Sequence, residues 1–167
     1  MHEQAIGSIV GVTFGCAWGI AGAAGLPGLW SVAAVGLSIV ISIALIVMLL
    51  LSKAQGQAGI FRGRIYGLAV AFEVVAIFVA VWSLNRAQLP QFLFPAIGFI
   101  VGLHFLGMWK ATEMRVFLWT TVAMCVLCVV AVLVPSLSRH GEVELRQAIV
   151  GLGNAFVLWS ASASTLK

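Results

Sequence analysis

The hydrophobic residues of this chain fall into six long runs, separated by short stretches that are polar or contain proline and glycine. A helix that crosses the hydrocarbon of a bilayer needs about 20 mostly apolar residues. Lipid offers no partner to free backbone groups, and the runs do not alternate as barrel strands do. We therefore predict an all-α polytopic membrane protein with six transmembrane helices, at Ala5–Ala24, Leu29–Leu51, Ile65–Leu84, Gln91–Trp109, Val116–Val134 and Leu145–Ser162.

The sequence of the first predicted helix recurs in the fourth. Residues 5–18 read AIGSIVGVTFGCAW and residues 96–109 read AIGFIVGLHFLGMW, with eight of fourteen positions identical. Weaker matches follow in the same order, between 29–34 and 118–123 and between 67–72 and 151–156. Because three helices per half place the two halves in opposite orientations, the pattern predicts a 3+3 inverted-topology repeat. The halves cover about 5–86 and 91–165 of a single transmembrane domain, 1–167.

The composition supports burial in lipid and indicates an orientation. Only 8% of the residues are charged, against about one quarter in a soluble domain, so the lipid bilayer must solvate most of the surface. The net charge of +4 comes from basic residues in short loops that form no stripe, so we expect no nucleic-acid partner. The positive-inside rule predicts that both termini are cytoplasmic. On that side lie Lys53, Arg62, Arg64, Lys110, Arg115 and Lys167, against Arg86, Arg139 and Arg146 outside.

Glycine recurs every fourth residue in the first helix, and the fourth helix keeps part of the pattern. Such a stripe carries no side chains and lets another helix backbone approach closely. We predict that the first and fourth helices cross in close contact, and a homo-oligomer contact through the first helix is the alternative. The residues of the stripe are Gly7, Gly11, Gly15 and Gly19, with Gly98 and Gly102 in the fourth helix.

Polar side chains inside the predicted helices are the candidates for chemistry, because hydrocarbon makes them costly. Glu73 lies near the middle of the third helix, and His104 lies in the fourth, toward the cytoplasmic side. If they touch, they form a buried pair that loads and releases one proton, or a hydrogen bond that only joins two helices. Thr13, the repeat counterpart of His104, and Asn154 in the sixth helix are the further candidates.

No metal or cofactor is predicted. The sequence shows no His, Asp or Glu cluster with metal spacing, no nucleophile elbow and no phosphate loop. Cys125 and Cys128 have C-x-x-C spacing, but they lie in an apolar helix without a second pair. We interpret them as small buried side chains.

Two stretches resemble a group of uncharacterised small bacterial integral membrane proteins with six spans. They are FRGRIYGLAVAFEVVAIF at 61–78 and GFIVGLHF at 98–105. The resemblance implies six helices in a bacterial inner membrane, and it brings no known activity, substrate or cofactor. Three functions stay open. A transporter or channel for a small solute, proton-coupled through Glu73 and His104, is favoured over a structural or partner-binding protein. A membrane enzyme acting on a lipophilic substrate comes third, so enzymatic activity is not the main expectation.

Overall fold

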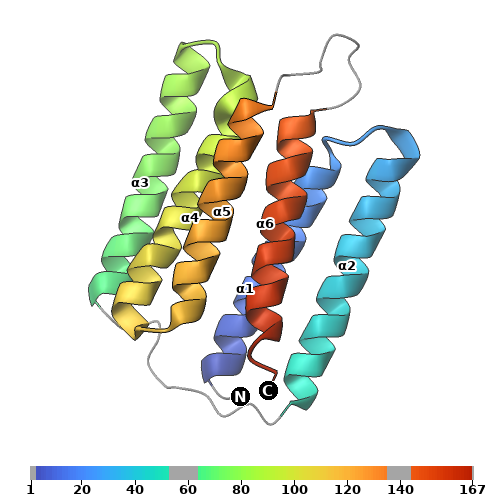
Figure 1. Cartoon of the computed structure of the whole chain (residues 1–167), viewed down its shortest axis with the longest axis vertical. Coiled ribbons are helices and arrows are strands. Elements are labelled where there is room, and N and C mark those ends of the chain that lie inside the picture. The colour runs from blue at the N-terminus through green and yellow to red at the C-terminus, as the bar shows by residue number, and fades with distance from the viewer. Residues whose placement is uncertain (1–2, 53–63, 135–143, 167) are drawn as a thin grey trace.

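The computed structural model describes residues 3–52, 64–134 and 144–166, with side chains from residue 7 onward. The described part holds six α-helices and one short 3-10 turn (Figure 1). Every helix end lies within three residues of its predicted position, so the six predicted helices are confirmed as helices. They are α1 (Glu3–Ala23), α2 (Gly28–Leu51), α3 (Arg64–Arg86), η1 (Pro90–Phe92), α4 (Leu93–Thr112), α5 (Arg115–Leu133) and α6 (Leu145–Ala163).

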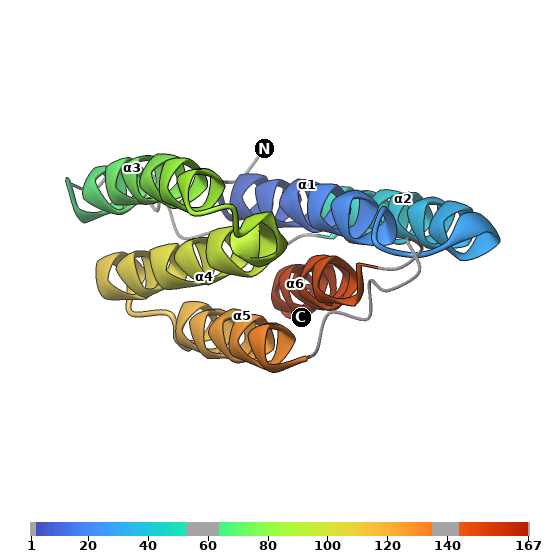
Figure 2. The same ribbon diagram turned by 90° about the horizontal axis from the view of Figure 1, so that it is seen from above.

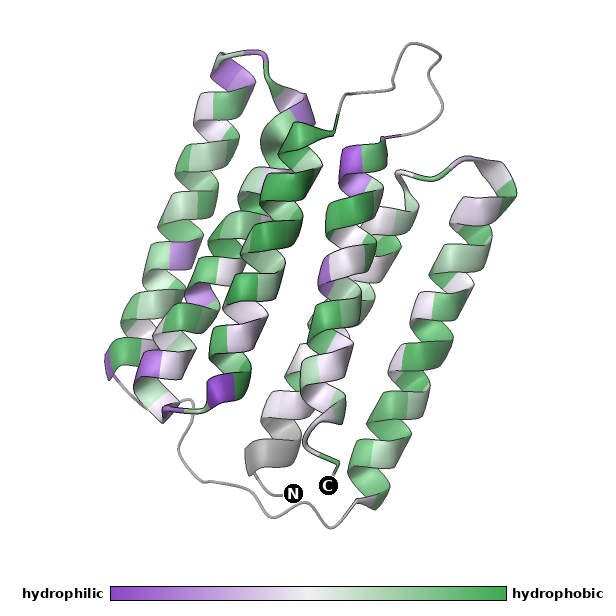
Figure 3. Cartoon of the chain, viewed as in Figure 1, coloured by the Kyte–Doolittle hydropathy of each residue, from purple (hydrophilic) through white to green (hydrophobic). Residues whose placement is uncertain are grey.

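Four helices of the described chain are long and apolar enough to cross a membrane. They are α2, α3, α5 and the continuous segment Pro90–Thr112 formed by η1 and α4. α1 contributes a shorter apolar stretch, Gly7–Ala23. α6 is more polar and buries eight residues among its neighbours. Hydrophobic positions cover the lengths of the helices and hydrophilic ones gather mainly at their ends (Figure 3).

The helices form two groups of three (Figures 1 and 2). In the first group α1 packs against both α2 and α6, and in the second α4 packs against both α5 and α3. Each group therefore combines the first two helices of one half of the chain with the third helix of the other half.

The contact between the two groups is one-sided. α6 packs against α4 and α5, whereas α3 makes no comparable contact with α1 or α2. No residue of α3 is buried. The groups are therefore packed together along α6 and stand apart along α3.

Gly11 and Gly15 of the α1 stripe face α6, and Gly19 faces Ser38 of α2, so the predicted crossing of the first and fourth helices is wrong. A Cβ on Gly11 would lie 2.6 Å from the Ser162 hydroxyl, and one on Gly15 would lie 2.7 Å from the Trp159 indole. Gly22, one turn beyond the predicted stripe, meets the backbone of α6 at Gly151. α6 can approach α1 this closely because the side of α6 that faces α1 also carries small residues. The backbones of the two helices therefore pack in direct contact.

Gly98 and Gly102 of α4 face α5 and α6. A Cβ on Gly98 would lie 2.8 Å from both the Cys128 sulfur and Val150, and one on Gly102 would lie 3.0 Å from the Cys125 sulfur. α1 and α4 do meet at one point, where the Trp18 and Phe94 rings pack edge to face with centroids 5.4 Å apart.

Polar contacts tie α6 to three neighbours at the end of the bundle remote from the chain termini. Gln147 Nε2 donates to the Ala21 carbonyl over 2.7 Å, which satisfies a free carbonyl near the end of α1. Arg146 Nε donates to the Val134 carbonyl over 3.1 Å, and its guanidinium lies 4.7 Å from the centre of the Phe92 ring. α1, α5 and η1 are therefore joined through the first turn of α6.

Candidate functional site

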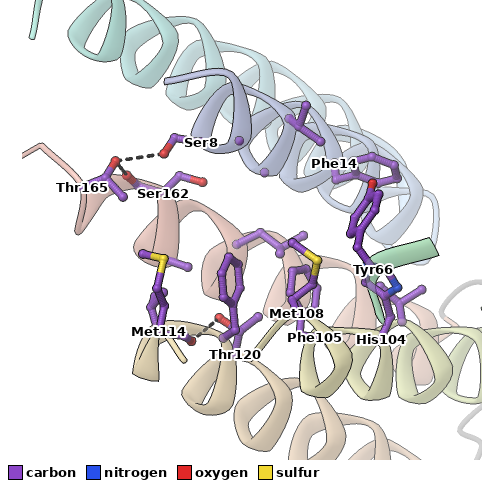
Figure 4. Close-up of a pocket in the computed structure, with 18 of the residues that line it drawn as sticks. Ser8, Phe14, Tyr66, His104, Phe105, Met108, Met114, Thr120, Ser162 and Thr165 are labelled. Carbon is purple, nitrogen blue, oxygen red and sulfur yellow. Dashed lines mark hydrogen bonds between the residues drawn. The ribbon is translucent and has the colours of Figure 1, made fainter. Parts of the chain in front are cut away.

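A cavity of about 280 Å³ lies where the two helix groups stand apart, with walls from α1, α3, α4, α5 and α6 (Figure 4). Its deep part is lined by Trp18, Glu73 and Val101, which lie near the middle of their helices or beyond it. Its other part is lined by Ser8, Met114 and Thr165, at the helix ends that adjoin the chain termini. The cavity therefore extends from mid-bundle toward the end that carries the termini.

Glu73 and His104 meet on the wall formed by α3 and α4. His104 Nδ1 lies 3.2 Å from Glu73 Oε2, and the two side chains are only 12% and 20% exposed respectively. The distance is that of an ion pair, but His104 Nδ1 makes no hydrogen bond of good geometry within the described residues. The contact brings together an acid and a base without the alignment that a fixed structural hydrogen bond would have.

Aromatic rings surround the His104 imidazole. Tyr66, seven residues before Glu73 on the same face of α3, packs edge-on against it with centroids 6.3 Å apart. Phe105 of α4 also packs edge-on against the imidazole, with ring centroids 5.7 Å apart. The described cavity residues of α1, α5 and α6, from residue 7 onward, include no titratable side chain. Lys110 shares a shallow outer pocket with His104, on the flank of α3 and α4 away from the cavity.

The wall formed by α4 and the start of α5 is aromatic and sulfur-rich. Phe105 and Phe117 stack with nearly parallel rings, 6.1 Å between centroids and 16° between planes. Met108 and Met114 add thioether groups, which adapt to irregular ligands. Phe14 lies at the rim, because it lines the cavity while 58% of its surface stays exposed.

The end of the cavity near the termini carries hydroxyl groups. The Thr165 hydroxyl donates to the Ser162 carbonyl over 2.7 Å, so it accepts from the Ser8 hydroxyl 2.9 Å away. This pair joins the start of α1 to the end of α6 (Figure 4). Thr120 lines the cavity too, but its hydroxyl bonds back to the Val116 carbonyl of its own helix at 2.9 Å.

Thr13 and Asn154 lie outside the cavity. Thr13 is exposed on another face of α1, where its hydroxyl donates to the Ile9 carbonyl over 2.9 Å. Asn154 is fully buried in the core, beside Gly98 and Cys128, and neither atom of its amide makes a hydrogen bond within the described residues. Of the four polar candidates, the structure brings only Glu73 and His104 together.

Sequence reasoning missed the aromatic side chains of the site. Phe14 shares a face of α1 with Gly7, Gly11 and Trp18, all of which line the cavity. The helical spacing of those residues could have indicated one surface, and the spacing of Tyr66 and Glu73 could have indicated another. Nothing in the spacing alone says that these two surfaces face each other.

Comparison with known proteins adds no family. No family model, no curated protein and no solved structure matches this chain. In the described part of the chain, no group of three or more His, Cys, Asp or Glu side chains is placed to hold a metal ion.

Proposed function

We propose that this protein is a membrane transporter for a small, largely apolar solute, and that it exchanges one proton through Glu73 and His104. The observation that carries the proposal is the position of the pair on the wall of a cavity between the two helix groups. A titratable pair in a dry helix contact would have no access to solute. Here the two groups that can hold the proton line the space that can hold the solute.

The proposal includes six transmembrane helices arranged as a 3+3 inverted repeat. Supporting it, α1 packs on α2 as α4 packs on α5, and α6 packs on α1 as α3 packs on α4. The third helix of each half thus lies on the first helix of the other. We place both termini in the cytoplasm of a bacterial cell and the protein in its inner membrane. Arg64, Lys110 and Arg115 stand at the end of the bundle that carries the termini, as the positive-inside rule requires (Figure 1).

An inverted repeat gives this arrangement a second state. At one end the cavity approaches the termini, and at the other the Arg146 and Gln147 contacts tie α6 to its neighbours. If the two halves exchange conformations, α3 packs against α1, and α6 withdraws from α4 and α5. The cavity then closes toward the termini and opens at the opposite end. Rocking of one repeat against the other around a central site is the usual route to alternating access.

The proton step follows from the chemistry of the pair. One proton shared between a carboxylate and an imidazole gives either an ion pair or a neutral pair, and both forms are tolerated where water is scarce. Loss of that proton leaves one negative charge on the cavity wall. An uncompensated buried charge is costly. Release of the proton is therefore linked to the binding of a group that compensates the negative charge on the cavity wall.

The test is solute uptake into proteoliposomes under an imposed pH gradient. A mixture of small apolar and amphipathic compounds is presented, and the solutes inside and outside the vesicles are quantified by mass spectrometry. The wild type is expected to accumulate at least one solute in a gradient-dependent way, and Glu73→Gln is expected to abolish that dependence. The fold of the variant is checked by circular dichroism and by size-exclusion chromatography.

One control variant and two possible results separate the competing functions. Glu144→Gln removes a carboxyl group at the opposite end of the bundle and should leave uptake unchanged, because Glu144 is exposed and outside the cavity. Uptake by Glu73→Gln that still responds to pH like the wild type would refute the proton role. A compound recovered in chemically altered form would instead support a membrane enzyme that uses the pair as acid and base.

A further inference from the structure

The chemistry of the cavity wall also selects among solutes, and this step rests on the proposed transport function. Glu73 is the only acidic residue that lines the cavity, and no Lys or Arg side chain lines it among the described residues. The same cavity is lined by the aromatic rings and thioethers of Phe14, Phe105, Phe117, Met108 and Met114. A fixed anion within an aromatic enclosure is the arrangement that recognises an organic cation.

We propose that the cavity binds a monovalent lipophilic cation, of the substituted-ammonium class, and that each bound cation displaces one proton from the Glu73–His104 pair. With the cavity empty, the pair holds one proton. When the cation binds, the proton leaves the imidazole for water and the cation takes its place beside the Glu73 carboxylate. One positive charge enters as one leaves, so the charge of the site is the same before and after.

The titratable groups that face this exchange are few. Tyr66 packs against the His104 ring from α3. Among the side chains that the structure describes, α1, α5 and α6 contribute no titratable group to the cavity. Outside the cavity, Lys110 lies on the outer flank of α3 and α4, in a second pocket that His104 also lines. The pair is therefore the proton source that the cavity offers.

The rim favours entry of such a cation from the membrane. α3 and α1 do not pack against each other there, and Val10 and Phe14 both line the cavity and stay exposed, at 40% and 58%. Exposed apolar residues at the depth of the hydrocarbon face lipid. An amphipathic cation dissolved in the inner leaflet would thus reach the carboxylate past Phe14 without crossing the polar helix ends.

The test uses benzyltrimethylammonium as the probe and isothermal titration calorimetry on the full-length protein in nanodiscs. This cation carries no exchangeable proton, so any proton released comes from the protein. Repeating the titration in buffers of different ionisation enthalpy counts those protons. We expect saturable binding near pH 7 with about one proton released per cation. Benzenesulfonate, similar in size and opposite in charge, should not bind, and empty nanodiscs correct for partition into lipid.

Variants locate the binding. Glu73→Gln should weaken binding at least about tenfold and abolish proton release, because it removes the anion. Phe14→Leu should weaken binding about fivefold without changing the proton count. Its matched control is Phe78→Leu, an exposed phenylalanine on α3 outside the cavity, which should bind like the wild type. Because Phe14 lies at the rim, this pair of variants remains informative if Glu73→Gln fails to fold.

Each outcome decides between the claims. Equal binding of the cation and the sulfonate, or cation binding without proton release, overturns the inference. Absence of cation binding together with pH-driven uptake of another solute overturns the inference and leaves the transport proposal standing. Cation binding with proton release but no flux of the same cation into proteoliposomes supports the inference and refutes transport.

Discussion

The tight crossing of α1 and α6 makes a quantitative prediction for Gly22→Ala. The new methyl carbon would lie 2.6 Å from the Leu152 nitrogen and 2.7 Å from the Gly151 Cα. Non-bonded carbons need about 3.5–4.0 Å, so the helices must separate locally by about 1 Å. Both atoms belong to the backbone, so no rotamer change relieves the contact. Overpacking of this kind costs about 1–3 kcal/mol, and we expect the free energy of unfolding to fall by that amount.

The matched control is Gly36→Ala in α2, where a Cβ would meet nothing within 4 Å. Alanine is favoured over glycine within a helix by about 0.5–1 kcal/mol, so this variant should be as stable as the wild type or slightly more so. Unfolding by sodium dodecyl sulfate in mixed micelles, followed by far-ultraviolet circular dichroism, measures both. If Gly22→Ala unfolds at the same detergent fraction as Gly36→Ala, the close approach of α1 and α6 described above is wrong.

Two further substitutions are checked by the same titration. Ser42→Ala removes the acceptor of the Trp159 indole N–H, 3.1 Å away in a buried contact, and should destabilise the protein by about 1–3 kcal/mol. Its control, Ser83→Ala, should leave the stability nearly unchanged, because Ser83 is exposed and its hydroxyl bonds only to its own helix. An equal response of the two serine variants would contradict the role of Ser42. Gln147→Met keeps the length of the side chain but removes the donor to the Ala21 carbonyl, and should cost about 0.5–1.5 kcal/mol, whereas no loss would mean that water replaces this bond.

The helices and their ends were predictable from the lengths and boundaries of the apolar runs. Runs of about 20 apolar residues bounded by polar or proline-containing segments have few alternatives to helices, and the observed bounds follow them closely. Depth could be predicted for the same reason. Glu73 and His104 lie at similar heights because each sits a known number of turns from its helix end, and this similarity is necessary for the observed contact.

Rotation and lateral order could not be predicted in the same way. Thr13 occupies the repeat position of His104, yet it faces away from the cavity, because equivalent depth does not fix which side of a helix faces inward. The glycine stripe correctly marks a close approach, but the stripe itself does not name the helix that approaches. α6 became the partner of α1 through its own small residues, including Gly151 and Ser162, which are complementary in shape rather than similar in sequence.

The interlock of α1 and α6 has a consequence for how the protein is made. α1 is synthesised before α6, so the most extensive helix contact joins two helices that are far apart along the chain. The core is therefore completed only after α6 has been synthesised. Until then, the glycine face of the nascent α1 is open to other partners. A polypeptide truncated before Leu145 would retain that open face.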